Sequence, residues 1–308
     1  MRVLVLGFTG YLGRHVVAHL SAAPPDTTVL RAGRSPAADI AVDLARDHPG
    51  QVAEALASAA PDTVVNCAGA TGGDAVTLAE TNARGPAVLC AALRESAPAA
   101  RLVHLGSAAE YGPGAPGTRV TESAATRPLG PYGATKLAGT VAVTASGLDA
   151  VVLRVGNPVG PGAPPTGLPG RIAALLRQAG PERDAVLRLG DLSAYRDFVD
   201  VRDVARAALL AATAGGPLPA VLNISGGQAV PVRELVRRLA HRAGFTGRIA
   251  ERAGGSARSA EVSWQCSSVT AAAEALGWRP VHTLDESLAA LWAATDPAAR
   301  DTEGERVP

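Results

Sequence analysis

The sequence predicts an α/β fold, a doubly wound parallel sheet with a smaller lobe formed largely by the C-terminal part of the chain. Short, almost entirely apolar runs alternate with longer amphipathic stretches over the first half of the chain. Such apolar runs are typical of parallel strands that helices cover on both faces. Their regular alternation with helices favours a doubly wound sheet. The 308 residues suffice for one large domain and a smaller partner.

In the first half, the predicted elements follow one another in alternation. They are strand Val3–Leu6, helix Leu12–Leu20, strand Thr27–Ala32, helix Gln51–Ala59, strand Thr63–Cys67, helix Thr77–Glu95, strand Leu102–Leu105, helix Pro131–Ala145 and strand Val151–Val155. Gly156–Gly170 is rich in glycine and proline and predicts a loop or crossover. The later elements are helix Arg171–Gln178, strand Val186–Leu189, helix Val201–Ala212, strand Val221–Ile224, helices Val232–Ala243, Thr270–Leu276 and Leu284–Ala293, an irregular Arg248–Val262 and a tail over 297–308.

Composition excludes several classes of function. The chain is 47% apolar and 19% charged, with a net charge of +1, so neither a nucleic-acid partner nor a membrane surface is expected. A strand pattern begins at once at Arg2, and no apolar run is long enough to span a bilayer, so we expect neither a signal peptide nor a membrane span. Cys67, Cys90 and Cys266 suit neither a disulfide framework nor a zinc site. A reduced cytoplasmic protein without a metal is expected.

A glycine-rich turn lies between the first predicted strand and the first predicted helix. It reads Gly7-Phe8-Thr9-Gly10-Tyr11-Leu12-Gly13, with three residues per glycine step. Glycines there allow a tight turn and let a pyrophosphate approach the helix N-terminus, where free N–H groups favour an anion. The turn predicts a Rossmann-type dinucleotide site, held by Gly7, Thr9, Gly10, Tyr11, Leu12 and Gly13.

The end of the second strand indicates which dinucleotide is bound. NAD-binding folds usually place an acid there to hold the ribose hydroxyls, but Leu30–Ser35 contains none. Arg34, with Arg31, is instead suited to hold a 2′-phosphate. NADP(H) is therefore favoured. If both arginines are merely solvated surface charges, NAD(H) remains possible.

Tyr132 and Lys136 stand four residues apart on a predicted helix and so share a face. A phenol has an ordinary pKa near ~10, and a neighbouring ammonium lowers it. Of the 29 basic residues only Lys136 is lysine, which argues for a specific role. Ser107 ends a strand and is suited to donate to the carbonyl oxygen that Tyr132 protonates.

Together these residues resemble the extended short-chain dehydrogenase/reductase family of nucleotide-sugar enzymes, from about Met1 to Trp292. Any single motif is weak, but their order and spacing are specific. They are the glycine turn, Asn66-Cys67-Ala68-Gly69, Asn82-Ala83-Arg84-Gly85, Ser107 before Tyr111-Gly112, the Tyr132/Lys136 pair, Leu153-Arg154-Val155-Gly156-Asn157-Pro158, Arg196-Asp197-Phe198 and Leu276-Gly277-Trp278-Arg279-Pro280.

The resemblance implies roles for residues at matching positions. Ser107, Tyr132 and Lys136 would be the catalytic residues. Further cofactor contacts would come from Asp43, Leu44, Cys67, Ala68, Gly69, Asn82, Tyr132, Lys136 and Val155. Substrate contacts would come from Ser107, Tyr132, Asn157, Arg196 and Arg258, of which Arg258 matches only by its distance from Leu276-Gly277-Trp278. The substrate lobe would comprise 161–194 and 227–296, and the dinucleotide domain 1–160 and 195–226.

Residues near Ser107 and Asn157 limit which reaction of the family this chain is expected to catalyse. The 4,6-dehydratases carry an acid pair where this chain has Ala108-Ala109, and alanine transfers no proton. The fucose synthases use a cysteine and a histidine where this chain has Ala109 and a histidine-free Asn157–Gly162 loop. Val186–Asp203 and Leu105–Gly112 are most similar to GDP-4-keto-6-deoxymannose reductases, while the composition, typical of a GC-rich coding background, leaves thymidine open as the base.

We therefore expect NADPH-dependent reduction of the 4-keto group of a nucleotide-activated 6-deoxysugar. An NDP-sugar 4-epimerase, which keeps its cofactor through the cycle, is one alternative. A ketoreductase acting on a non-sugar natural product is another, and a non-catalytic cofactor-sensing regulator is disfavoured by the retained Tyr132/Lys136 pair. The resemblance also implies a homodimer formed through the helix that carries Tyr132.

Overall fold

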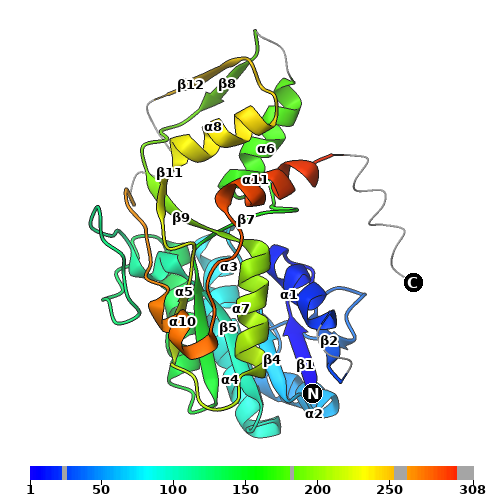
Figure 1. The fold of residues 1–308 in the computed structure, drawn as a ribbon. Coiled ribbons are helices and arrows are strands. Elements are labelled where there is room, and N and C mark those ends of the chain that lie inside the picture. Colours follow the sequence, from blue (N-terminus) through cyan, green and yellow to red (C-terminus); the bar gives the residue numbers. More distant parts are fainter. Residues whose placement is uncertain (23–25, 181–183, 253–261, 297–308) are drawn as a thin grey trace.

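The computed structural model describes residues 1–22, 26–180, 184–252 and 262–296, and within these a seven-stranded sheet forms the centre (Figure 1). Its order is β10-β6-β5-β4-β1-β2-β3, and every pairing is parallel. The strands are β1 (Arg2–Leu6), β2 (Thr28–Gly33), β3 (Ile40–Ala41), β4 (Thr63–Asn66), β5 (Arg101–Ser107), β6 (Ala150–Val155) and β10 (Val221–Ile224). The predicted doubly wound α/β sheet is confirmed.

Helices cover both faces of this sheet (Figure 1). On one face α1 (Tyr11–Ser21) packs against α7 (Val201–Thr213), and on the other α2 (Pro49–Ala59), α4 (Gly85–Ser96) and α5 (Pro131–Thr144) pack together. Each face encloses its own apolar core. Because both faces are covered, β1, β4 and β6 are almost wholly buried. No helix within the described residues is both long enough and apolar enough to cross a bilayer.

A smaller lobe lies beyond the carboxyl ends of the strands, at the top of Figure 1. Its core is formed by helices α6 (Leu168–Ala179), α8 (Val232–Arg242) and α11 (Leu284–Ala293). Two small sheets join it, β11-β9-β7 and β12-β8. Their strands are β7 (Asn157–Val159), β8 (Val186–Leu189), β9 (Tyr195–Asp200), β11 (Ala229–Pro231) and β12 (Arg248–Glu251).

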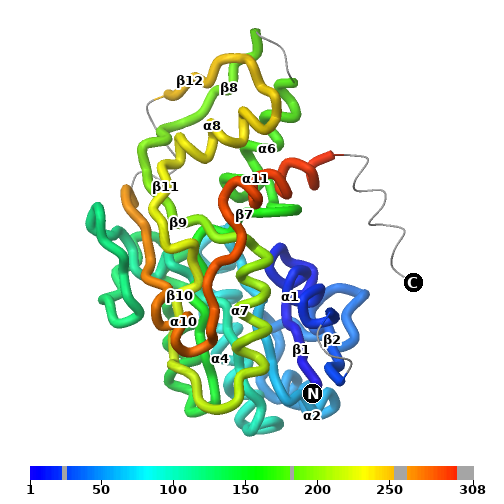
Figure 2. The backbone as a smooth tube through the Cα atoms, viewed as in Figure 1, coloured from blue at the N-terminus to red at the C-terminus, as the bar shows by residue number. Residues whose placement is uncertain are grey.

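The segment after residue 262 returns to the main sheet before it reaches α11 (Figure 2). Helix α10 (Thr270–Leu276) packs beside β10, and Trp278 is completely buried in the same core as α1 and α7. Trp278 Nε1 donates to the carbonyl oxygen of Asp203 at 2.9 Å. Residues 262–280, expected in the substrate lobe, thus contribute to the core of the large domain.

Several predicted elements differ from the observed ones. The expected helix Thr77–Glu95 is divided into α3 (Ala75–Ala79), a π-helical turn η1 (Glu80–Arg84) and α4. Part of the expected loop Gly156–Gly170 is β7, and the start of the expected irregular segment is β12. These short strands exist because distant segments pair with them, Asn157 with Phe198 and Arg248 with Val186, which local sequence patterns do not reveal.

Candidate active site

The turn between β1 and α1 depends on its glycines. Gly7 has a φ of +73°, and a Cβ there would lie 2.7 Å from the backbone nitrogen of Ala68. A Cβ on Gly13 would lie 2.1 Å from the carbonyl oxygen of Gly7. Glycine at these two positions therefore lets the turn lie against the segment after β4 and lets α1 begin directly behind it.

The N-terminus of α1 is open to an anion. Within the described residues no side chain caps this helix, and its first turn contains no acid. Thr9 and Gly10 are exposed, while Tyr11 and Leu12 are partly buried. The backbone N–H groups and the helix dipole favour negative charge here. The glycine turn and the uncapped helix thus fit the diphosphate of a dinucleotide.

The two arginines near the end of β2 differ in their surroundings. Arg31 forms an ion pair with Asp39 at 2.9 Å, and its hydrogen bonds hold the pKa of that carboxyl at about 2. Arg34 is exposed, and no described residue forms a hydrogen bond or ion pair with its side chain. Of the two, Arg34 is therefore the one whose guanidinium no described carboxylate occupies. No sequence pattern indicated this pair, because a ribose-binding acid was expected within Leu30–Ser35 and Asp39 lies beyond that stretch.

The loop after β3 is held in place by Arg84 of η1. The Arg84 guanidinium donates to the carbonyl oxygens of Leu44 at 2.9 Å and Asp47 at 2.8 Å. Leu44 is buried, whereas Asp43 is half-buried and accepts from the backbone nitrogen of Ala45 at 3.1 Å. The two predicted adenine contacts, Asp43 and Leu44, therefore lie on a well-supported loop.

Asn82, on the π-helical turn, supports the segment after β4. Its side chain exchanges two hydrogen bonds with the backbone of Ala70, at 2.9 and 2.8 Å, and donates to Thr135 Oγ1 on α5 at 3.3 Å. A Cβ on Gly69 would lie 3.3 Å from Asn82 Oδ1 and 3.7 Å from Lys136 Nζ. Asn82 thus joins the segment that follows Cys67-Ala68-Gly69 to α5. In the same segment, burial raises the pKa of the Cys67 thiol to about 12.

Lys136 lies under the carboxyl end of β5. Only 5% of it is exposed, and its Nζ donates to the carbonyl oxygen of Leu105 at 2.5 Å. Burial lowers its pKa to about 8, an effect that the nearby Glu110 carboxylate partly opposes. At neutral pH the group is therefore an ammonium placed beside the predicted cofactor segment.

Tyr132 and Ser107 belong to two elements that pack against each other. Tyr132 stands in the first turn of α5, one turn before Lys136. A Cβ on the adjacent Gly133 would lie 2.6 Å from the carbonyl oxygen of Ala109, so this turn packs directly on the one-turn 3₁₀ helix η2 (Ala108–Tyr111). Ser107 caps η2 and accepts from the backbone nitrogen of Ala109 at 3.2 Å. Val155 ends β6 directly opposite Ser107.

The predicted substrate residues lie at the junction with the lobe. Asn157 Nδ2 donates to the carbonyl oxygen of Asp197 at 3.1 Å and to Gln265 Oε1 at 2.8 Å. Arg196 donates to the carbonyl oxygen of Val262 at 2.7 Å, and burial lowers the pKa of its guanidinium. No carboxylate pairs with Arg196 among the described residues. Arg258 lies outside them.

Glu110 was not among the predicted site residues. Its side chain is completely buried, accepts from the backbone nitrogen of Ser107 at 2.7 Å and forms an ion pair with Arg154 at 2.7 Å. The sequence does contain a signal for it, because Ser107-Ala108-Ala109-Glu110 has the spacing of a capping box, and that box is present. The pattern gives no hint that the carboxylate would also be buried beside Lys136.

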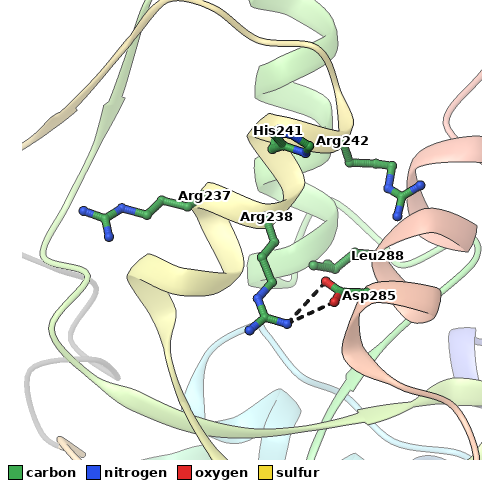
Figure 3. A pocket seen from close by; sticks show the side chains of 6 residues that line it. All are labelled: Arg237, Arg238, His241, Arg242, Asp285 and Leu288. Atoms are coloured by element: carbon green, nitrogen blue, oxygen red, sulfur yellow. Dashed lines mark hydrogen bonds and ion pairs between the residues drawn. The ribbon is translucent and has the colours of Figure 1, made fainter.

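A hollow of about 390 Å³ lies elsewhere, between α8 and α11 of the lobe (Figure 3). It is lined by Arg237, Arg238, His241, Arg242, Asp285 and Leu288. Arg238 forms ion pairs with Asp285 and Glu234, and Arg237 points away from the other labelled side chains (Figure 3). None of the predicted site residues lines it, so we do not assign it to the active site.

Comparison with known proteins gives a consistent picture. Residues 3–225 match the model of the NAD dependent epimerase/dehydratase family. The dTDP-6-deoxy-L-talose 4-dehydrogenase (NAD(P)(+)) of Kitasatospora kifunensis is 39% identical over 96% of both chains. The GDP-6-deoxy-D-mannose reductase of Pseudomonas aeruginosa is 28% identical over 97% of this chain and 99% of its own.

Solved structures share the whole fold. The structure of RMD from Pseudomonas aeruginosa complexed with NADPH superposes with a TM-score of 0.82 at 27% identity, over 95% of this chain and 98% of that one. MoeE5 in complex with UDP-glucuronic acid and NAD gives a TM-score of 0.83 at 29% identity, over 96% and 99%. The extended short-chain dehydrogenase/reductase architecture expected from the sequence is confirmed.

Proposed function

The chain belongs to the NAD dependent epimerase/dehydratase family, and from this premise we propose that it reduces the 4-keto group of a nucleotide-activated 6-deoxysugar with NADPH. Membership makes it an NAD(P)-dependent enzyme that modifies nucleotide sugars. The observation that carries the finer assignment is its 39% identity to a dTDP-6-deoxysugar 4-dehydrogenase, whose named reaction is the reverse of a 4-keto reduction. We therefore favour dTDP over GDP as the nucleotide.

The residues of this chain supply the proton chemistry. Tyr132 donates a proton to the C4 carbonyl oxygen, and Ser107 donates a hydrogen bond to the same oxygen. Lys136, an ammonium below pH 8, stabilises the phenolate that Tyr132 becomes. The nicotinamide cofactor, when bound, supplies the hydride. Ala108 and Ala109 offer no acid or base, so the chemistry stops at the reduced sugar.

The residues around the glycine turn would hold the dinucleotide. The turn from Gly7 to Gly13 would bind the diphosphate, Arg34 the 2′-phosphate and Lys136 the ribose next to the nicotinamide. The remaining predicted contacts are Arg31, Asp43, Leu44, Cys67, Ala68, Gly69, Asn82, Tyr132 and Val155. The nucleotide-sugar diphosphate would lie against Asn157 and Arg196, whose guanidinium has no carboxylate partner among the described residues. We also propose a homodimer through α5, where Val141 is 55% exposed.

A 4-epimerase is the second candidate, because a UDP-glucose 4-epimerase of Streptomyces lividans is 31% identical over 73% of this chain. The purified protein should be mixed with a dTDP-linked 4-keto-6-deoxyhexose and NADPH, and separately with UDP-glucose. A reductase oxidises one NADPH for each keto-sugar consumed, whereas an epimerase interconverts UDP-glucose without net cofactor turnover. Absence of NADPH oxidation with 4-keto-sugars linked to either dTDP or GDP rejects the proposal.

The rate of reduction should fall as the pH rises through about 8. Burial lowers the pKa of Lys136 to about 8, so the side chain is charged at pH 7 and neutral at higher pH. A neutral amine no longer stabilises the Tyr132 phenolate. The measurement is the pH dependence of kcat/KM for the keto-sugar at saturating NADPH. A profile that stays flat up to about pH 10, where an ordinary lysine titrates, would contradict the assignment.

Arg34→Ala should weaken binding of NADPH by about 10-fold or more while leaving NADH binding nearly unchanged. A hydrogen bond to a charged group contributes about 1.5–3 kcal/mol, and only NADPH carries the 2′-phosphate. Arg171→Ala, which removes another exposed arginine on α6 of the lobe, is the matched control. Dissociation constants from fluorescence titration decide the matter. An equal loss of affinity for NADPH and NADH would show that Arg34 does not contact the 2′-phosphate.

A further inference from the structure

Glu110 is buried next to two of the proposed catalytic residues, Ser107 and Lys136. Its side chain has no exposed surface, and each carboxylate oxygen has a partner. Oε1 accepts from the backbone nitrogen of Ser107 and Oε2 from Nε of Arg154, both at 2.7 Å. A carboxylate is costly to bury, so these hydrogen bonds must offset the loss of its hydration.

The sheet leaves room for this carboxylate at Gly106. A Cβ at that position would lie 2.8 Å from Glu110 Oε1 and 2.7 Å from Val152 Cγ1. Gly106 lies opposite Arg154 in the pairing of β5 with β6. The glycine that leaves space for the Glu110 carboxylate is therefore the neighbour of the arginine that neutralises it. The buried acid is therefore accommodated by the backbone of two central strands.

Arg154, the other member of the ion pair with Glu110, is held in place as well. The Arg154 guanidinium lies 4.5 Å from the centre of the Tyr111 ring, and Tyr111 donates through its hydroxyl to Asn223 Oδ1 at 2.8 Å. Asn223, on β10, donates from its backbone nitrogen to Glu122 Oε1 at 2.8 Å. Contacts from η2 and β10 thus hold Arg154, and through it Glu110, in one position.

Glu110 also acts on the charge of Lys136. The groups that face this lysine are Glu110 from η2, Cys67 after β4, His104 on β5 and, one helical turn away, Tyr132. Burial raises the pKa of the Cys67 thiol and lowers that of His104, so both are neutral at pH 7. Among the described residues around Lys136, Glu110 is therefore the anion that opposes the cost of burying the ammonium.

We propose that Glu110 is a positioning residue of the reaction: its carboxylate fixes the backbone of Ser107 and supplies the buried negative charge near the Lys136 ammonium. The proposal deepens the function proposed above and rests on it for the roles of Ser107 and Lys136. Arg154 prevents the carboxylate from becoming an uncompensated buried charge and fixes its orientation.

The single lysine of the chain allows a direct test that needs no substrate. Protein grown with lysine labelled with ¹³C at Cε, and carrying no lysine in any tag, gives one side-chain NMR signal, which reports the titration of Lys136. In the unmodified protein its midpoint should lie near pH 8. Glu110→Gln keeps the acceptor for Ser107 but removes the charge, and should lower the midpoint by about one pH unit, as expected when a nearby opposite charge is lost.

Arg154→Gln removes the cationic member of the same ion pair and is the matched variant. It should leave the midpoint at or above the original value, because the Glu110 carboxylate remains. Glu122→Gln, at the end of the hydrogen-bond chain that does not face Lys136, should leave it unchanged. Circular dichroism and thermal unfolding identify folded samples, and any variant that unfolds can be replaced by the Glu110→Gln/Arg154→Gln double variant, which removes both charges and should also lower the midpoint.

The kinetics supply a second readout. The alkaline limb of the kcat/KM profile should move with the lysine midpoint, downward for Glu110→Gln and not for Arg154→Gln. An unchanged midpoint in Glu110→Gln, or a midpoint that falls as far in Glu122→Gln as in Glu110→Gln, would overturn the proposal. If the midpoints shift as expected but no keto-sugar is reduced, the fault lies with the proposed reaction and not with the electrostatic role of Glu110.

Discussion

Replacing Tyr132 by phenylalanine is expected to lower kcat for keto-sugar reduction by about 10²- to 10⁴-fold, the usual contribution of a general acid. The variant removes one hydroxyl and leaves the ring, which is half-buried in the first turn of α5. Ala108 and Ala109, on the packed η2 turn, carry only methyl groups and supply no replacement proton donor. The loss should therefore appear in kcat.

Single-turnover reduction measured with pre-bound NADPH is the appropriate readout, because it isolates the chemical step. NADPH affinity and thermal stability should stay near their original values, since the glycine turn and Lys136 are intact. Tyr195→Phe, on β9, provides a matched loss of a phenol elsewhere in the molecule and should leave the chemical step unchanged. If Tyr132→Phe reduces the keto-sugar at the normal rate, the assignment of Tyr132 is wrong.

Gly13→Ala should lose both cofactor binding and stability. The new Cβ would be placed 2.1 Å from the carbonyl oxygen of Gly7, a backbone atom that can yield only if the whole turn moves. Overpacking of this kind typically costs about 1–3 kcal/mol, and here it also displaces the N–H groups proposed to bind the diphosphate. We expect a fall of about 10-fold or more in the affinity for NADPH and NADH alike.

Gly50→Ala on α2 is the control, because the nearest heavy atom to its Cβ is His48 Nδ1 at 3.6 Å and no clash arises. Denaturant unfolding and cofactor titration should leave this variant close to the original protein. A Gly13→Ala protein with normal stability and normal cofactor affinity would mean that the turn does not have the close packing described here.

Most of the fold could be predicted because its strands are buried on both faces. The predicted strands Val3–Leu6 and Thr63–Cys67 are largely apolar for that reason, and they lie in the observed sheet as Arg2–Leu6 and Thr63–Asn66. By contrast β9 contains Arg196, Asp197 and Asp200, and its strand conformation depends on pairing with β7 and β11. Such pairing between distant segments has no local sequence signal.

Part of the candidate site could likewise be proposed from the sequence. Tyr132 and Lys136 stand out through their spacing and through the single lysine, and the glycine turn through its place after the first strand. The partners of buried charges were not predictable, because Glu110 meets Arg154 from 44 residues away. Likewise, the pairing of Arg31 with Asp39 depends on how the chain turns after β2.

Transfer of deuterium tests the central claim most directly. NADPH deuterated at nicotinamide C4, on one face or the other, should be incubated with a dTDP-linked 4-keto-6-deoxyhexose and the protein, and the product examined by NMR and mass spectrometry. We predict one deuterium at C4 of the sugar, from only one of the two labelled cofactors, with one NADPH oxidised for each sugar reduced. Oxidation of the labelled NADPH without deuterium at C4, or a sugar that changes configuration with no NADPH consumed, would contradict it.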